Sequence, residues 1–274
     1  MDYAKAEWRL VNSGFQDGPS NMACDEAILE AVALGQSPPT LRFYSWEPAC
    51  ISLGYRQSWR LIDESYFQDT GWDIVRRPTG GRAILHVDEL TYSVCAPVDE
   101  PRVQGRVLES YQRLSEALLS GLQAMGLKPV KANPDPTRGE VDGPACFDGP
   151  SNYEITVQGR KLIGSAQVRK KGVVLQHGTL PLFGDVSRIC QALCFERDDQ
   201  RQALIRDLRR QAITLEEALG RRISYDEAVS SMQAGFEDAL NLDFTISELS
   251  ESELDRSAEL RTEKFANDNW TQRL

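Results

Sequence analysis

The cysteine at position 146 is the clearest candidate for a nucleophile in this sequence. It lies in a stretch rich in proline and glycine, residues 143–150, which is typical of a loop. A structural cysteine more often acts as a small apolar residue inside a packed helix or strand. A loop thiol with a cation beside it can instead ionise, and the thiolate is the reactive form. The sequence therefore favours Cys146 as a reactive thiol.

Lys161 is the candidate cation. It begins a segment, residues 161–167, in which Gly164, Ser165 and Ala166 are small and leave space for a ligand. A nearby ammonium group stabilises a thiolate and lowers the thiol pKa from its usual value of about 8.5. Lys161 can approach the thiol if the loop and the following hairpin fold back on each other. A lysine that faces solvent at the end of a hairpin is the alternative.

Paired glycines between two strand patterns mark a further candidate site, residues 76–83, with the sequence RRPTGGRA. Glycines let backbone N–H groups approach a ligand, and flanking arginines can bind a carboxylate or a phosphate. An ordinary turn between strands has the same composition and is the alternative. His86, at the end of the following strand, is either a hydrogen-bonded structural residue or a base.

The other five cysteines fit packing positions. Cys24 falls on the apolar face of a helix pattern, and Cys50 and Cys95 fall in strand patterns. Cys190 and Cys194 are four residues apart on an expected helix without a nearby histidine or cysteine partner, so we expect no zinc site. We also expect free thiols, because the sequence has neither a disulfide-rich composition nor a CxxC pair.

Composition and charge restrict the partners. The 274-residue chain is 41% apolar and has a formal net charge of −10, with 18 acidic against 11 basic residues from Glu196 onward. A locally basic segment, residues 151–175, suits an anionic ligand or an acidic partner protein, or simply forms the solvated ends of a hairpin. We expect no binding of nucleic acid. The absence of a long apolar run and of an export signal predicts a cytoplasmic protein without a transmembrane helix.

Alternating strand and helix patterns fill the first two-thirds of the chain. Ser20 is the expected N-cap of a first helix that ends near Gly35, and residues 107–125 repeat at helical spacing until Gly126. A long loop is expected over residues 133–152. The expected strands are residues 41–45, 50–55, 73–77, 83–86, 90–96, 153–157, 161–167, 173–177 and 179–182.

Residues after Gly184 have only helical patterns. Ser224 with Glu227, and Ser250 with Glu253, form capping boxes that each begin a helix. The sequence therefore predicts an α+β fold in two parts. A catalytic domain covers residues 1–185, and a helical C-terminal extension, residues 186–274, packs on it.

Three segments resemble, in the same order, the biotin/lipoate protein ligase superfamily in its lipoate branch. They are RRPTGGRAILH at residues 76–86, GRKLIGSAQ at 159–167 and LQHGTLPL at 175–182. The likeness spans roughly residues 8–190. It implies a central mixed β-sheet flanked by helices, with an acyl chain in a tunnel and its activated carboxyl group near the lysine.

Within that superfamily, the chain is most similar to the octanoyl-ACP:protein N-octanoyltransferases of the LipM type. The residues after the first motif, DELTYSV at 88–94, and the ACF triplet at 145–147 carry this closer likeness. Two tail segments, LGRRISYDEAV at 219–229 and KFANDNW at 264–270, also resemble that group.

The resemblance implies a role for each candidate residue. Cys146 would carry the acyl group as a thioester, and Lys161 would lower the pKa of that cysteine. The substrate-binding residues would be Arg77, Thr79, Gly80, Gly81, Arg82, Ala83, His86, Gly164, Ser165 and Ala166.

The implied reaction moves an octanoyl group in two steps. Cys146 takes it from octanoyl-acyl carrier protein, and a lysine of a lipoyl domain, such as the glycine cleavage H protein, then receives it as an amide. Transfer from a thioester to an amine runs downhill, so the resemblance implies no ATP, no metal and no other cofactor.

Other functions stay open. In an ATP-dependent lipoate–protein ligase, Lys161 and Arg77 would hold an acyl-adenylate, and Cys146 would have no role. A biotin ligase fits less well, because residues 76–83 differ from its glycine- and arginine-rich biotin loop. An amidotransferase that moves octanoyl groups between carrier proteins also uses a cysteine. A non-catalytic module that binds acyl groups or carrier proteins would not need Cys146.

Overall fold

The computed structural model describes residues 3–132, 145 and 154–274, and its strands form two sheets. The large sheet contains β1 (Ala6–Gln16), β2 (Thr40–Trp46), β6 (Glu89–Pro97), β7 (Val130–Lys131), β8 (Ile155–Val157), β9 (Arg160–Lys170), β10 (Val173–Pro181) and β11 (Leu242–Ile246). Its order within the described residues is β11-β1-β2-β6-β10-β9-β8-β7. The small sheet has the order β4-β3-β5 and contains β3 (Cys50–Leu53), β4 (Asp73–Arg76) and β5 (Ile84–His86).

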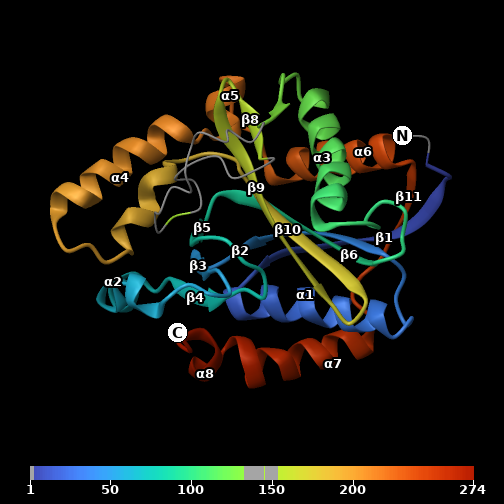
Figure 1. Cartoon of the computed structure of the whole chain (residues 1–274), viewed down its shortest axis with the longest axis horizontal. Helices are drawn as coiled ribbons and strands as arrows, with labels where there is room; N and C mark the ends of the chain where they lie inside the picture. Colours follow the sequence, from blue (N-terminus) through green and yellow to red (C-terminus); the bar gives the residue numbers. More distant parts are fainter. Residues whose placement is uncertain (1–2, 133–144, 146–153) are drawn as a thin grey trace.

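The large sheet is mixed. β1 runs parallel to β11 and β2, whereas β6 is antiparallel to β2 and β10, and β9 is antiparallel to β10. Helices cover both of its faces (Figure 1). The predicted central mixed sheet flanked by helices is therefore confirmed.

Two pairs of helices form the layers on either side of the large sheet (Figure 1). α1 (Gly18–Ala33) and α7 (Glu251–Leu260) pack together on one side, and α3 (Val107–Ala124) and α6 (Tyr225–Leu240) on the other. None of the helices in the described part of the chain is both long and apolar enough to cross a membrane. The remaining helices are α2 (Glu64–Thr70), α4 (Asp198–Gln211), α5 (Leu215–Leu219) and α8 (Asp268–Thr271).

The helical repeat of α3 buries one face against the sheet and α6. Leu114, Leu118 and Leu122 are fully or almost fully buried, as their spacing of four residues predicts. The two helices approach closely where Gly235 faces Gly121, because a Cβ atom at Gly235 would lie only 2.3 Å from the Gly121 nitrogen. Larger residues at this crossing would push the helices apart.

The prediction that everything after Gly184 is helical is wrong at one element. β11 lies within this segment and pairs in parallel with β1, with Ala6 opposite Leu242. Five residues are too few to show a clear alternation, so the strand could not be separated from its helical surroundings in the sequence. The division at residue 185 stays a prediction, although β11 ties the tail directly to the large sheet.

Three local predictions also need correction. The N-cap of α1 is Asp17, whose Oδ1 accepts from the Ser20 backbone nitrogen at 2.7 Å, so Ser20 lies inside the helix. The two strands expected over 173–177 and 179–182 are one strand, β10, because Gly178 continues the ladder. The helix expected to hold both Cys190 and Cys194 is a 3₁₀ turn that ends at Gln191, which leaves Cys194 exposed.

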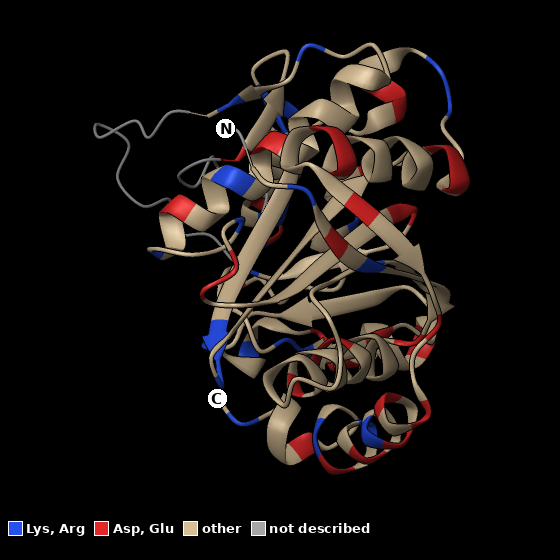
Figure 2. Ribbon diagram, turned by 90° about the vertical axis from the view of Figure 1, so that its right-hand side faces the viewer, with Lys and Arg blue, Asp and Glu red and all other residues tan. Residues whose placement is uncertain are grey.

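The locally basic segment is neutralised in the folded chain. Lys170 pairs with Glu26 at 2.7 Å, and Lys171 with Glu30 at 2.8 Å, so the β9–β10 hairpin is tied to α1. Arg160 pairs with Glu217 at 2.7 Å. Acidic and basic residues are interspersed over both helical layers (Figure 2). A broad basic surface for an anionic partner therefore does not form in this segment.

Candidate active site

The glycine-rich segment, residues 76–83, connects β4 to β5 and curves around the side chain of Arg77. This guanidinium donates from Nη2 to the carbonyl oxygens of Gly80 (2.8 Å) and Arg82 (2.7 Å). Gly81 has φ +91°, a backbone conformation that favours glycine. Arg77 thus holds the curve of the segment from within. Its predicted contact with a substrate stays a prediction.

Thr79 connects the glycine-rich segment to the large sheet through a chain of buried hydrogen bonds. Its Oγ1 lies 2.6 Å from Nε2 of His177 on β10, and Nδ1 of His177 lies 3.3 Å from Oδ2 of Asp25 on α1. All three residues are buried. A polar chain therefore crosses from the helical layer, through the sheet, to the predicted substrate segment.

The pKa shifts fix the direction of these hydrogen bonds. Burial raises the pKa of Asp25, but hydrogen bonds from His177 and the charge of Arg42 outweigh it and lower the pKa overall. Burial lowers the pKa of His177 below its ordinary value, although Asp25 acts in the opposite direction. At neutral pH, Asp25 is therefore ionised and His177 neutral, with its proton on Nδ1. The Thr79 hydroxyl then donates to Nε2 of His177.

Asp25 is the centre of a wider polar cluster. Its Oδ1 accepts from Nη1 of Arg42 (2.8 Å) and from the Ser93 hydroxyl (2.7 Å), and its Oδ2 accepts from the Tyr44 hydroxyl (2.8 Å). The side chains of Arg42 and Asp25 are completely buried. Because a buried carboxylate is costly without partners, several donors from three strands are needed to hold it here.

His86 belongs to a second buried group. Its Nδ1 lies 2.8 Å from Glu89, its Nε2 lies 2.7 Å from the Ser52 hydroxyl, and its ring stacks on Trp46 at 4.0 Å between centroids. Glu89 also accepts from Thr179. Of the two interpretations of His86, these contacts favour the structural one. Its predicted contact with a substrate stays a prediction.

The small residues of β9 and the glycine-rich segment both contact β10. Ala166 lies opposite His177 in the ladder, and Ser165 opposite Gly178. Part of the space beside Gly178 is filled, because a Cβ atom there would lie 2.4 Å from the Ser165 hydroxyl and 2.6 Å from the Tyr92 ring. The structure thus brings two of the predicted substrate segments to the same strand.

Lys161 is buried and paired. Its side chain is 2% exposed and forms an ion pair with Glu154, whose side chain is 3% exposed. This burial excludes the alternative of a solvent-facing lysine. The carbonyl oxygen of Lys161 accepts from the Ile213 nitrogen at 2.9 Å, so the start of β9 is fixed against the residues that follow α4.

The predicted nucleophile, Cys146, lies outside the described residues. Its neighbour Ala145 is buried and forms an isolated parallel bridge with Ala83. The residue before Cys146 therefore lies alongside the end of the glycine-rich segment. The contact between Cys146 and Lys161 stays a prediction.

Comparison with known proteins identifies the family of the sequence and solved structures with a similar fold. Residues 17–237 match the family described as the lipoyl protein ligase A/B catalytic domain. The chain belongs to this family. Its likeness to solved structures agrees: it superposes with a TM-score of 0.81 on a bipartite lipoate protein ligase from Thermoplasma acidophilum, at 23% identity, over 97% of this chain and 96% of that one. A lipoate-protein ligase A bound with ATP gives a TM-score of 0.78 at 24% identity, over 97% and 98%.

Curated relatives in the lipoyl ligase family are more similar in sequence. The chain is 42% identical to a protein named Octanoyltransferase LipM from Symbiobacterium thermophilum, over 98% of this chain and 99% of the relative. It is 44% identical to the protein of that name from Moorella thermoacetica and 38% identical to that from Bacillus subtilis, over 97% of this chain and 98% of each relative. The predicted superfamily and its LipM-type branch are confirmed.

Sequence reasoning missed the polar residues that position the predicted site in this lipoyl ligase family member. His177 lay within the motif at residues 175–182 but was not singled out. Asp25 gave a weaker signal, as one of three acidic residues in a mainly apolar helix, and nothing in the sequence paired it with Arg42. Glu89 directly preceded the strand expected over 90–96, and its partners could not be identified.

Proposed function

We propose that this chain transfers an octanoyl group from octanoyl-acyl carrier protein to a lysine of a lipoyl domain, through a thioester on Cys146. The observation that carries the proposal is the likeness, over nearly the whole chain, to several proteins named Octanoyltransferase LipM. The acceptor would be a lipoyl domain such as that of the glycine cleavage H protein. The substrate segments would be those around Thr79 and Ser165.

In the first half-reaction, the Cys146 thiolate attacks the carbonyl carbon of the octanoyl thioester. A new carbon–sulfur bond forms, the bond to the donor's sulfur breaks, and the donor thiolate leaves and takes up a proton. An octanoyl chain needs only an apolar environment, which stabilises it by about 0.8 kcal/mol for each buried CH₂.

In the second half-reaction, the neutral amine of the acceptor lysine attacks the same carbonyl carbon. A carbon–nitrogen bond forms, the Cys146 sulfur leaves as a thiolate, and the nitrogen loses one proton to give the amide. The free thiolate is restored without ATP or a redox partner.

The ion pair of Lys161 with Glu154 gives the proposed role of the lysine a physical setting. In a buried site the positive charge of Lys161 would act on a nearby thiolate with little screening by water. Glu154 holds the ammonium in place but also offsets part of its field. We therefore propose that the pair, rather than the lysine alone, sets the reactivity of Cys146.

Intact-mass measurement of the acyl-enzyme tests the proposal. Incubation with octanoyl-acyl carrier protein should add one octanoyl group to the wild-type chain, and Cys146→Ser should slow transfer to the acceptor by about 10³-fold or more. Cys194→Ser is the matched control, since Cys194 is an exposed thiol. Burial raises the pKa of Cys50 and Cys95 well above the ordinary value, so neither should replace Cys146.

The outcomes separate this function from its main alternative. If no octanoyl adduct forms, and lipoate with ATP instead releases pyrophosphate, the chain is an ATP-dependent lipoate–protein ligase. An adduct that persists in Cys146→Ala, which has no hydroxyl or thiol at this position to accept the octanoyl group, would place the nucleophile at another residue.

A further inference from the structure

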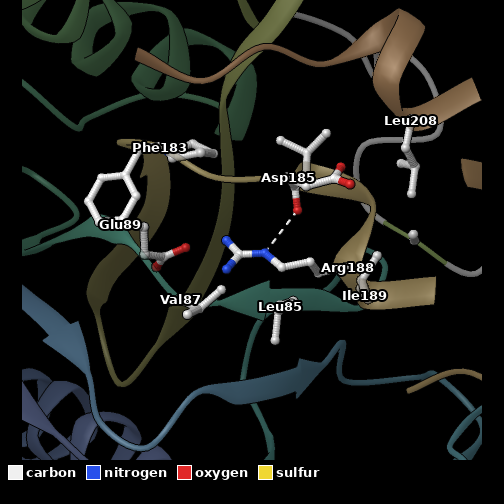
Figure 3. Close-up of a pocket in the computed structure, with 11 residues that line it drawn as sticks. Leu85, Val87, Glu89, Phe183, Asp185, Arg188, Ile189 and Leu208 are labelled. Atoms are coloured by element: carbon white, nitrogen blue, oxygen red, sulfur yellow. Dashed lines mark hydrogen bonds between the residues drawn. The ribbon is translucent and has the colours of Figure 1, made fainter. Parts of the chain in front are cut away.

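A pocket is lined in part by Ala145, the residue before the predicted nucleophile in the sequence, and shares none of its described lining residues with the predicted substrate-binding set (Figure 3). It is a shallow hollow, and the space of about 440 Å³ that it outlines includes open solvent. Its walls come from distant parts of the chain: Leu85 on β5, Val87 directly after β5, Phe183 after β10, Leu208 on α4, and Ala145. Most of the wall is apolar.

The pocket lies on the opposite face of β5 from the His86 cluster. Side chains alternate along a strand, so Ile84 and His86 point to one face and Leu85 to the other. The burial of β5 follows this alternation, because Ile84 and His86 are buried and Leu85 is half-buried. The pocket therefore lies on the Leu85 side of β5, and Glu89 is the residue that it shares with the polar group around His86.

Ala145 places the pocket next to the predicted chemistry. It contributes to the pocket wall, and Cys146 is the next residue in the chain. A thioester that reacts at Cys146 has two parts on either side of its carbonyl carbon: the acyl chain and the thiol-bearing arm. The predicted acyl site uses β9 and the glycine-rich segment, so the pocket is available for the other part.

One arginine gives the pocket a donor for that arm. Arg188 donates from Nη1 to Asp88 (2.8 Å) and from Nε to the Asp185 carbonyl oxygen (3.0 Å), whereas Nη2 has no hydrogen-bond partner among the described residues. Its guanidinium points toward the side of the pocket where Glu89 lies (Figure 3). No other Lys or Arg lines the described part of the wall.

The two acidic side chains of the wall are already bonded. Glu89 accepts from His86 and Thr179, and Asp185 accepts from Ser187 and Arg209. Arg188 Nη2 is therefore the group in the described wall with a donor to offer. A ligand with an apolar body and carbonyl or phosphate oxygens matches these walls.

We propose that this pocket binds the thiol-bearing arm of the acyl donor, a 4′-phosphopantetheine chain with its dimethyl group, amides and phosphate. The apolar walls contact the chain, and Arg188 donates to one of its oxygen atoms. The pocket then holds the part of the donor that leaves as a thiol when Cys146 is acylated. The assignment rests on the proposed function.

Two donors that carry the same acyl group test the assignment. Octanoyl-4′-phosphopantetheine has the whole arm, and octanoyl ethyl thioester lacks it. The rate constant for acylation of Cys146 is followed by intact mass for each, and the wild type should favour the donor with the arm. Arg188→Ala should reduce this preference about 10-fold, as expected for one charge-assisted hydrogen bond. Val87→Phe, which fills the pocket, should reduce it as well.

Controls make the result specific. Arg209→Ala removes a neighbouring cation that lies outside the pocket wall, so it should leave the preference at the wild-type value. The rate with octanoyl ethyl thioester reports whether each variant is still folded and reactive.

Two results would overturn the assignment. The first is an unchanged preference in both pocket variants. The second is a change in the order of reactivity of hexanoyl, octanoyl and decanoyl donors in Val87→Phe, which would place the acyl chain in the pocket. If the wild type forms no octanoyl adduct with octanoyl-acyl carrier protein, the proposed function itself fails.

Discussion

The polar groups on the two faces of β5 differ in how completely they are hydrogen-bonded. On the face of His86, buried side chains donate and accept in clusters centred on Asp25 and Glu89. On the face of Leu85, the wall is apolar and Arg188 keeps one nitrogen without a partner in the described chain. A strand of three residues separates these surroundings.

This difference distinguishes the groups that hold the fold together from the groups that are able to bind a ligand. A buried charge that is bonded on all sides fixes the elements around it, and removing one partner leaves the others in a low-dielectric interior. A donor left open at an apolar wall stabilises little in the empty protein and can act on a ligand. Substitutions on the His86 face should therefore reduce stability, and those on the Leu85 face should change substrate preference.

The largest loss of stability is expected from Asp25→Asn. The change leaves the buried Arg42 without its anionic partner, which should lower the free energy of unfolding by about 3–5 kcal/mol. Urea denaturation at pH 7 measures it. Glu30→Gln is a control on the same helix, since its pairs with Lys171 and Arg256 are partly exposed and should contribute less than about 1 kcal/mol. Equal losses in the two variants would contradict the central role of Asp25.

Glu89→Gln tests the residue that the two faces share. Gln cannot accept from all the donors around Glu89, so the free energy of unfolding should fall by about 1–3 kcal/mol. The preference for the donor with the 4′-phosphopantetheine arm should stay unchanged, because Glu89 is bonded to His86 and Thr179 and not to Arg188. Denaturation and the two-donor comparison measure both effects. A changed preference with intact stability would move Glu89 to the binding face.

Thr79→Val should have a smaller effect, about 1–2 kcal/mol, because it leaves Nε2 of the neutral His177 without a donor in a buried position. Thr79→Ser keeps the hydroxyl and should restore most of the loss. Nitrogen-15 NMR of the wild-type imidazole at pH 7 gives an independent measurement and should show the proton on Nδ1. A proton on Nε2 would reverse the hydrogen bond that we assign to Thr79.

The smallest effect is expected at Asp185, on the Leu85 face. Burial alone would raise its pKa, but bonds from Arg209 and Ser187 lower it to about 2, from 3.8. Its contribution to stability is therefore complete above about pH 4 and is lost as the pH falls towards 2. Since the pair with Arg209 is largely exposed, Asp185→Asn should cost less than about 1 kcal/mol at pH 6 and nothing near pH 2. Urea denaturation at several pH values tests this, and a cost that grows with acidity would contradict it.

Much of the fold could be predicted because its elements have strong local patterns. The alternation over 41–45 and 90–96 locates β2 and β6, and the repeat of 107–125 locates α3 within one residue of its end. Ser224 and Ser250 both cap their helices, and of the two predicted capping boxes the one at Ser250 with Glu253 forms in full. Failures came where a local pattern is short or ambiguous: five residues for β11, a glycine inside β10, and two possible caps, Asp17 and Ser20, three residues apart.

The candidate site was less predictable because its contacts join residues that are far apart in the chain. Two of these contacts depend on how the strands are ordered in the sheet: Arg42 with Asp25, and Thr79 with His177. Lys161 could be selected by its sequence motif, whereas its burial against Glu154 depends on the packing of β9. The exposure of Cys194 likewise depends on where a 3₁₀ turn ends.

The parallel pairing of β1 with β11 has a consequence for synthesis of the chain. β1 leaves the ribosome well before β11, because Ala6 meets its partner Leu242 only after 236 more residues have been added. At 5–20 residues per second this takes about 10–50 s, during which one edge of β1 has no strand to pair with. Contacts between such distant residues also slow folding of the complete chain. The nascent protein therefore depends on β2, the other neighbour of β1 in the large sheet, to hold β1 until β11 is added.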